Sequence, residues 1–174
     1  AHWLHTKTGS RNFCLAGGVA MNCVMNGNLS KKPFVNDIFI QPAASDNGVS
    51  LGAAQLLTIQ EGITPSYKME HAYWGPEFSE DEIITALNES KVSYRKSKNI
   101  CFEVAEKISR GKIVGWFQGR MEIGARALGN RSILASPLIN DMKTKINLEV
   151  KHRENWRPFC PSMKEEVYHK YINT

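Results

Sequence analysis

A glycine- and arginine-rich stretch, residues 119–132, constrains the fold and chemistry of this chain more than any other part of its sequence. These fourteen residues hold three glycines and three arginines, and they directly follow an apolar run, 113–117, that predicts a buried strand. Glycine lets backbone N–H groups approach a ligand closely, and a guanidinium fork matches two oxygens of a phosphate or carboxylate. Because α/β proteins bind anionic ligands where a strand ends in such a loop, this stretch, called the arginine motif below, predicts an anion site.

The spacing within the arginine motif leaves the identity of that anion open. It matches neither the Walker A pattern nor the G-x-G-x-x-G fingerprint, so no nucleotide follows from a standard motif. A simpler interpretation is a solvated turn whose arginines pair with Glu122 and neighbouring acids, since surface arginines are common. On composition alone both interpretations stand.

Charge is distributed unevenly along the 174 residues. Residues 1–94 carry six Lys and Arg against nine Asp and Glu, whereas residues 95–174 carry sixteen against eight. This asymmetry suggests an anionic ligand or nucleic acid at the C-terminal half. No apolar run approaches the ~20 residues that a membrane span requires, and no N-terminal targeting signal is recognisable. The sequence therefore predicts a cytoplasmic protein with no membrane partner.

The cysteines and histidines do not form a recognisable site. Cys14, Cys23, Cys101 and Cys160 are scattered, with no C-x-x-C pair and no histidine at zinc-binding spacing. A chain of this size does not need disulfides to stabilise its core, so buried free thiols are expected. The five histidines are interpreted as structural or exposed.

Strand, glycine turn and helix follow one another twice between residues 13 and 59, which is an α/β pattern. Before them, Gly9 and Ser10 resemble a helix stop. The expected elements are a strand over 13–16, a helix from 23 to about 29, a strand over 37–40, and a helix over 49–59 capped by Asp46 or Asn47.

The sequence pattern changes over residues 62–76, where prolines, glycines and polar residues replace the periodic apolar pattern. We therefore predict a first domain over 1–64, a linker over 65–76 and a second domain over 77–174. The second domain is expected to open with a helix whose capping box joins Ser79 and Glu82. Its further expected elements are a strand over 92–94, a helix over 100–109, strands over 112–118 and 133–134, and an amphipathic helix over 141–153.

Four segments together resemble a known family. They are residues 13–22 (FCLAGGVAMN), residues 42–48 (PAASDNG), the arginine motif, and residues 153–161 (RENWRPFCP). The chain resembles, from about 13 to 171, the O-carbamoyltransferases of the nodulation-protein and antibiotic-carbamoylation type. The resemblance implies an α/β fold, α+β in its second part: the second lobe of an actin-like (ASKHA) domain followed by part of a YrdC-like domain.

The resemblance also implies a reaction in two steps. In the YrdC-like domain, carbamoyl phosphate and ATP give carbamoyl adenylate. The actin-like domain then transfers the carbamoyl group to the hydroxyl of a small-molecule acceptor, a sugar or natural product, while Fe(II) polarises the carbamoyl group as a Lewis acid. A homodimer is left open.

Site residues follow from the resemblance by position. Arg120 and Arg126 are implied to grip carbamoyl phosphate and ATP, and Asp46 to be a metal ligand. Nucleotide-binding roles are implied for Gly17, Gly18, Val19, Asn22, Asn130 and Arg131. Ala125 stands where a proline is usual, which leaves the arginines in place.

Other parts of the family pattern have no counterpart in this sequence. These are the histidine pair of the metal site and a tail rich in Asn, Ser and Phe. The chain is therefore expected to be an internal fragment that binds iron weakly or not at all, because one aspartate supplies too few ligands. The Gly-Gly-Val-Ala form is shared with tRNA threonylcarbamoyladenosine enzymes, so nucleic-acid binding is the rival function. Against it, the arginines cluster at one loop and do not alternate with stacking aromatics.

Overall fold

The computed structural model describes residues 1–64 and 69–172, which form two compact units. The first unit contains residues 1–83 and 118–131, and the second contains residues 84–117 and the chain from 132 onward. Most of the arginine motif therefore belongs to the first unit, although it is far along the sequence from the other residues of that unit. Residues 65–68 of the predicted linker lie outside the described residues, and the predicted domain division stays a prediction.

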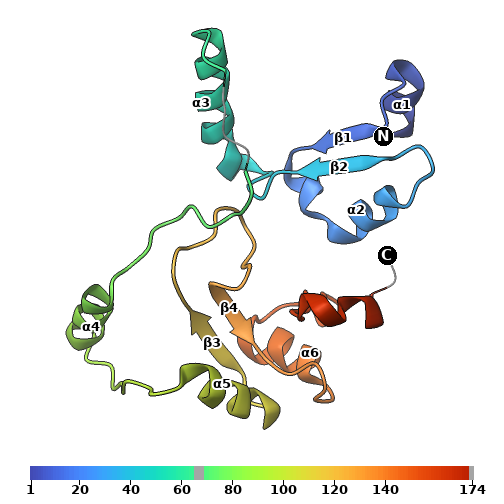
Figure 1. The fold of residues 1–174 in the computed structure, drawn as a ribbon. Helices are drawn as coiled ribbons and strands as arrows, with labels where there is room; N and C mark the ends of the chain where they lie inside the picture. Colours follow the sequence, from blue (N-terminus) through green and yellow to red (C-terminus); the bar gives the residue numbers. More distant parts are fainter. Residues whose placement is uncertain (65–68, 173–174) are drawn as a thin grey trace. The chain divides into compact units, whose positions relative to one another are not determined.

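Two parallel strands lie side by side in the first unit (Figure 1). β1 (Asn12–Leu15) pairs with β2 (Asp37–Ile40), and Phe13 lies opposite Ile38. Both strands were expected from their apolar residues. Phe13 is buried and packs edge-on against the ring of Phe34, at 6.2 Å between centroids.

The crossover between the strands runs through a short 3-10 turn, η1 (Gly18–Met21), and a helix, α2 (Cys23–Ser30). The carboxyl ends of parallel strands share one edge of a sheet, so the turns that follow β1 and β2 lie together. The contact is direct, because the N–H of Gly17 donates to the carbonyl oxygen of Ala44 at 2.7 Å. The fold thus joins two of the segments that carry the family resemblance.

Two further helices flank this pair in the chain. α1 (His2–Thr8) ends at Gly9, whose φ of 72° confirms the expected helix stop. α3 (Val49–Gln60) follows the 3-10 turn η2 (Asp46–Gly48). The predicted capping of α3 by Asp46 or Asn47 is wrong: Gly48 occupies the N-cap, and the Asn47 side-chain oxygen accepts from Ser45 Oγ at 3.0 Å.

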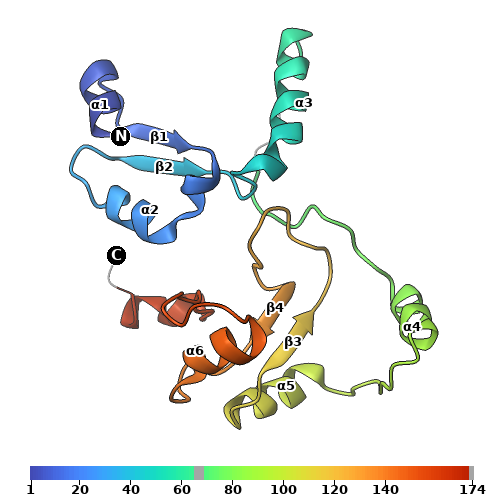
Figure 2. The same ribbon diagram turned by 180° about the vertical axis from the view of Figure 1, so that it is seen from behind.

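The second unit contains most of α4 and the elements after it, except for the loop before β4. In chain order these are α4 (Glu80–Glu89), α5 (Ile100–Ser109), β3 (Val114–Phe117), β4 (Arg131–Leu134), α6 (Met142–Lys145), the π-helical turn η3 (Ile146–Val150) and the 3-10 turn η4 (Glu165–Lys170). β3 and β4 form a two-stranded sheet, and α5 contacts β3 (Figure 2).

The predicted capping box at the start of α4 is confirmed. Ser79 donates to Glu82 Oε2 from its backbone N–H at 2.8 Å and from its hydroxyl at 2.7 Å, and the N–H of Glu82 donates to Ser79 Oγ at 3.3 Å. Hydrogen bonds from the backbone and side chain of Ser79 hold the pKa of Glu82 below its ordinary value. Local sequence therefore determines where this helix begins.

Three expectations for the second unit are wrong. The segment 92–94 is no strand, because Lys91 takes a φ of 54° and the N–H of Val92 donates to Leu87 O at 3.1 Å, which closes the end of α4. The helix expected over 141–153 is α-helical only in α6 and widens into η3. β3 is half-buried and exposed in alternation, not buried.

The four cysteines are free, as expected, but they are exposed, not buried. Within the described residues no helix is long and apolar enough to cross a membrane. The fold is a mixture of helices and small sheets and agrees with the predicted α/β class. The actin-like and YrdC-like assignments stay predictions.

Candidate functional site

The loop between β3 and β4, residues 118–130 (the arginine loop), is hydrogen-bonded to the segment 72–76 of the first unit. The N–H of Ile123 donates to Ala72 O at 2.7 Å, the N–H of Met121 to Pro76 O at 2.9 Å, and the N–H of Gly75 to Met121 O at 2.9 Å. Ala72 is buried. Backbone pairing of this kind fixes the start of the loop independently of its side chains.

Gly124 allows the loop to pack closely against the turn that follows β2. Its φ of 101° is unfavourable for other residues, and a Cβ at this position would overlap the carbonyl oxygen of Pro42 and lie 2.8 Å from its carbon. The close approach brings Arg126 to the turn after β1, where its Nη2 donates to Met21 O at 3.3 Å. The structure thus brings Arg126 next to the predicted nucleotide-binding turn.

Asn130 closes the base of the loop. Its carbonyl oxygen accepts from Gln118 N at 3.1 Å and from Arg131 Nη1 at 2.9 Å, and its side-chain amide donates to Arg120 O at 2.7 Å. Gln118 Nε2 donates to Asn130 Oδ1 at 3.1 Å. Asn130 and Arg131, predicted to contact nucleotide, therefore have structural contacts within the loop.

Glu122 holds the second half of the loop. Its Oε1 accepts the N–H groups of Leu128 and Asn130, both at 2.7 Å. Burial raises the pKa of the Glu122 carboxyl, but the backbone N–H groups that donate to it, led by Asn130 and Leu128, outweigh burial and hold the pKa below its ordinary value. The simpler interpretation of the motif expected Glu122 to pair with arginine; its hydrogen bonds here are with the backbone.

This anchoring predicts a titration. A carboxylate whose pKa is lowered in the folded state stabilises that state fully above its ordinary pKa of 4.5. This stabilisation is lost as the pH falls through the lower pKa of the folded state. The amide signals of Leu128 and Asn130 in an NMR titration of the 174-residue chain should therefore move with a midpoint below 4.5. Glu122→Gln should remove this titration. A midpoint at or above 4.5 would contradict the anchoring.

The two arginines with predicted phosphate contacts are exposed. Arg120 Nη2 lies 3.5 Å from Glu77 Oε2, and about half of each side chain is exposed, so the pair contributes little to stability. The Arg120–Glu77 pair therefore agrees with part of the simpler interpretation, in which the arginines of the motif form surface ion pairs. A weak exposed pair also leaves the guanidinium able to exchange its partner for a substrate anion.

The Gly17–Gly18 turn is open to a ligand. Gly17 has a φ of 90°, a Cβ at either glycine would have no atom within 4 Å, and the side chain of Val19 is exposed. The N–H of Gly17 is already bonded to Ala44 O, so N–H donation to a nucleotide falls to the residues after it, while Gly17 leaves room for the ligand. Asn22 caps α2, its side-chain oxygen accepting the N–H of Met25 at 3.0 Å.

Asp46, the predicted metal ligand, lies exposed in η2 at the same edge of the sheet. In the part of the chain that the structure describes, no three His, Cys, Asp or Glu side chains lie close enough together to hold a metal ion. One carboxylate does not fit the donor set of an iron site. The metal role of Asp46 therefore stays a prediction.

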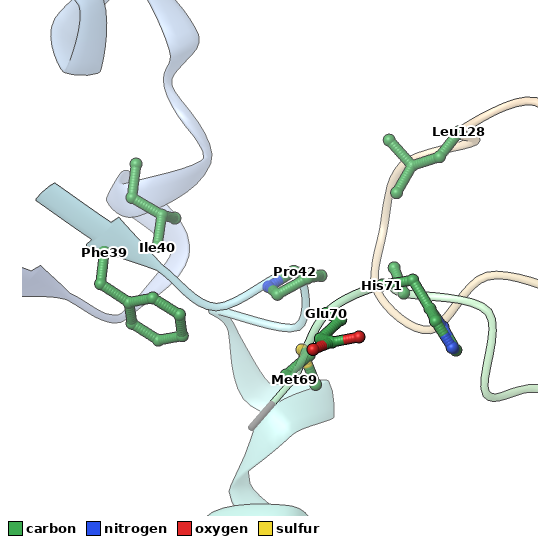
Figure 3. Close-up of a pocket in the computed structure, with 8 residues that line it drawn as sticks. Phe39, Ile40, Pro42, Met69, Glu70, His71 and Leu128 are labelled. Carbon is green, nitrogen blue, oxygen red and sulfur yellow. The ribbon is translucent and has the colours of Figure 1, made fainter. Parts of the chain in front are cut away.

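A pocket of about 310 Å³ lies where the arginine loop meets the end of β2. Figure 3 shows Phe39 and Ile40 from β2 on one side, Leu128 and His71 on the other, and Pro42 between them. Met69, Glu70 and Ala72 complete the lining. The hydroxyl of Tyr73 donates to Leu128 O at 3.0 Å and steadies this part of the loop.

The segment 153–161 of the second unit is organised by Asn147, which is completely buried in η3. The Asn147 side chain accepts from Arg153 Nε at 2.7 Å and donates to Arg157 O at 3.0 Å. The guanidinium of Arg153 lies over the ring of Phe159, at 4.8 Å from its centroid. Arg153 thus has a structural role in this segment.

Comparison with known proteins identifies the chain's relatives. The family model "Carbamoyltransferase N-terminus" matches residues 2–55, and "Carbamoyltransferase C-terminus" matches residues 105–174. Together the two matches span more than half of the sequence. The chain belongs to the carbamoyltransferase family. The matches contain the Gly17 turn and the arginine loop respectively, so both parts of the candidate site lie in family regions.

Individual relatives agree with this assignment. The chain is 44% identical to nodulation protein NolO of Bradyrhizobium diazoefficiens, over 93% of the chain and 30% of that protein. It is 42% identical to nodulation protein NolNO of Sinorhizobium fredii, over 95% of the chain and 25% of that protein. Nodulation protein U of Rhizobium tropici is 33% identical, over 94% of the chain and 27% of that protein. The chain spans less than a third of the length of these curated relatives.

Two residues that organise the loops, Glu122 and Asn147, are not predicted as such by the sequence. Glu122 was considered only as an arginine partner, and Asn147 was not singled out. Glu122 could have been found from its place in a glycine-rich loop, where free backbone N–H groups need an acceptor. Asn147 gave no such signal, because its neighbours at helical spacing are mostly polar: Lys143, Thr144 and Lys151.

Asn22 offers a test that separates capping from nucleotide binding. Asn22→Ala should destabilise the chain by about 1 kcal/mol, because the cap of α2 is lost. Asn22→Asp and Asn22→Ser keep a capping oxygen and should unfold like wild type in denaturant. If the side chain faces a nucleotide phosphate, Asn22→Asp alone should weaken ATP binding, since it adds a negative charge. Equal ATP affinity of the Asp and Ser variants would rule out the phosphate contact.

Proposed function

We propose that the chain is part of a longer, ATP-dependent O-carbamoyltransferase that moves a carbamoyl group from carbamoyl phosphate, through carbamoyl adenylate, to a hydroxyl. Membership of the carbamoyltransferase family and the similarity to NolO support carbamoyl transfer. The observation that carries the proposal is the placement of the exposed Arg126 beside the open Gly17–Gly18 turn. A guanidinium fork and an open glycine turn together suit a substrate that carries phosphate and nucleotide.

The proposed first step is balanced as follows. Carbamoyl phosphate takes up one water, its bond between the carbamoyl oxygen and phosphorus breaks, and inorganic phosphate leaves. The resulting carbamate oxygen attacks the α-phosphorus of ATP, and pyrophosphate leaves. In the second step the acceptor hydroxyl attacks the carbamoyl carbon, loses its proton, and AMP leaves.

Arg120 and Arg126 are proposed to hold the phosphates of carbamoyl phosphate and ATP, by neutralising charge that builds up as phosphate and pyrophosphate leave. Gly17, Gly18, Val19 and Asn22 are proposed to receive the nucleotide part of the adenylate. Asn130 and Arg131 are proposed to contribute through the base of the loop, where their hydrogen bonds lie.

The acceptor is proposed to be a small molecule with a free hydroxyl, a sugar or natural product. Asp46 is proposed as the ligand that this chain supplies to an Fe(II) site completed by other residues. A homodimer and a cytoplasmic location complete the proposal.

The rival function, a nucleotide- or nucleic-acid-binding role in tRNA modification, is not favoured, because both family models that match the chain are those of carbamoyltransferases. A salt titration discriminates the two. Binding of nucleic acid falls steeply with salt on a log–log plot, whereas binding of one small anion falls with a shallow slope. Binding of tRNA that falls steeply with salt, together with no binding of carbamoyl phosphate, would favour the rival function.

The proposed reaction is tested by incubating the intact enzyme with carbamoyl phosphate labelled with ¹⁴C at the carbonyl carbon, together with ATP and without acceptor. Label should appear in the nucleotide fraction as carbamoyl adenylate. Omitting ATP should abolish that product. Label that stays entirely in carbamoyl phosphate and its hydrolysis products would contradict the proposed intermediate.

A further inference from the structure

Glu122 is the only acidic residue in the arginine loop, whose other charged residues are arginines. Its Oε1 receives two backbone N–H groups, from Leu128 and Asn130, at 2.7 Å each. Backbone N–H groups that converge on one point form a concavity that binds phosphate and other anions. In this loop the concavity already holds an anion, and that anion is the protein's own carboxylate.

The same bonds define the part of the loop that carries Arg126. Residues 123–127 run between Glu122 and Leu128, so the hydrogen bond between these two residues closes the segment into a short ring. Within the ring, the N–H of Ile123 is bonded to Ala72 O, and Gly124 packs on the backbone of Pro42. Arg126 is therefore held on a segment fixed at both ends, although its own side chain is exposed.

We propose that Glu122 is a positioning residue: its carboxylate fills the N–H concavity of the arginine loop and so holds Arg126 where it meets the substrate phosphate. This inference rests on the proposed function. It adds that the phosphate is recognised by guanidinium side chains and not by the N–H groups of Leu128 and Asn130, which Glu122 occupies. Recognition by a planar fork favours a phosphate that presents two oxygens side by side.

The test compares Glu122→Ala and Glu122→Gln in the intact enzyme, with pyrophosphate release from ATP as the assay and carbamoyl phosphate as the varied substrate. Glu122→Ala should raise KM for carbamoyl phosphate about tenfold, because a displaced Arg126 guanidinium loses its charge-assisted hydrogen bonds to the substrate phosphate. The kcat value at saturation should fall much less. Glu122→Gln keeps an oxygen that accepts the two N–H groups and should lie between alanine and wild type.

A double variant tests whether Glu122 acts through Arg126. If it does, Glu122→Ala with Arg126→Ala should have the same KM as Arg126→Ala alone, since the positioned group is already gone. KM effects that multiply would overturn the proposal. Glu106→Gln is the matched control, because it removes an exposed acid that pairs with Arg110 in the second unit. Its KM should equal that of wild type.

The remaining outcomes separate the two claims. A wild-type enzyme that releases no pyrophosphate in response to carbamoyl phosphate would overturn the proposed function and this inference with it. An active wild type with an unchanged KM in Glu122→Ala would overturn this inference alone. A lower KM in Glu122→Ala would do the same, since the emptied concavity would then be taking the phosphate. If Glu122→Ala fails to fold, Glu122→Gln provides the test. A wild-type KM in Glu122→Gln, although its Leu128 and Asn130 amide signals are displaced, would also overturn this inference.

Discussion

Arg126→Ala is expected to raise KM for carbamoyl phosphate in the intact enzyme at least tenfold. A charge-assisted hydrogen bond contributes about 1.5–3 kcal/mol, and 1.4 kcal/mol corresponds to a factor of ten. Within the described residues, the hydrogen bond from the exposed Arg126 side chain to Met21 O is long, at 3.3 Å, so alanine removes little that supports the fold. Denaturant unfolding of the variant should therefore resemble wild type while the kinetics change.

Arg126→Lys sharpens this test. Lysine keeps the charge but cannot reproduce the bidentate fork, so it should also lose affinity. Arg110→Ala is the control, because Arg110 pairs with Glu106 on the exposed face of the second unit and is not part of the site. If Arg126→Lys had wild-type KM, charge alone would explain binding and the fork argument would be wrong.

Gly124→Ala should have the largest effect on the loop itself. The alanine would have to adopt a φ of 101°, and its Cβ would overlap the carbonyl oxygen of Pro42. Strained backbone costs about 1–3 kcal/mol, and overpacking typically costs a similar amount. The loop should detach from the turn after β2, with loss of stability in denaturant unfolding and a raised KM for carbamoyl phosphate.

Gly129→Ala separates these two causes. Gly129 has a φ of 116°, similar to that of Gly124, but a Cβ there would have no atom within 4 Å. This variant should show the backbone strain without the steric overlap, and so lose less stability than Gly124→Ala. Equal losses would mean that contact with Pro42 does not hold the loop.

Local signals in the sequence predicted the elements that depend on neighbouring residues. The capping box of Ser79 and Glu82, the stop at Gly9 and the boundaries of α5 are confirmed, because each is determined within one helical turn. The strands β1 and β2 are confirmed because their apolar residues are short runs between glycine or polar turns. The carbamoyltransferase family was likewise recognisable from its motifs.

What escaped the sequence depends on contacts between distant residues. Whether residues 92–94 form a strand is decided by how α4 ends, through Lys91 and Leu87, and not by their β-branched or aromatic side chains. Glu122 became an anchor only because the loop folds back on it. Asn147 is buried only because α6 widens into a π-helical turn that accommodates the segment 153–161.

Some of the predicted site residues are brought together by the fold, and others are not. Gly17 and Ala44 lie together, as the parallel strand pair requires, and Arg126 lies beside the same turn. Asp46 shares that edge, but within the described residues no group of three or more possible metal ligands forms. The anion-binding roles of Gly17 and Arg126 and the metal role of Asp46 all stay predictions.

Calorimetric titration of carbamoyl phosphate into the intact enzyme tests the central claim most directly, because it measures binding without requiring turnover or an acceptor. The decisive variant is Arg120→Ala with Arg126→Ala, and the matched control is Arg95→Ala with Arg110→Ala, which removes two exposed arginines that pair with Glu103 and Glu106. We predict that the first pair weakens binding at least about tenfold, as expected for the loss of charge-assisted bonds, while the control pair binds like wild type. Unchanged affinity in the Arg120 and Arg126 double variant would contradict the account.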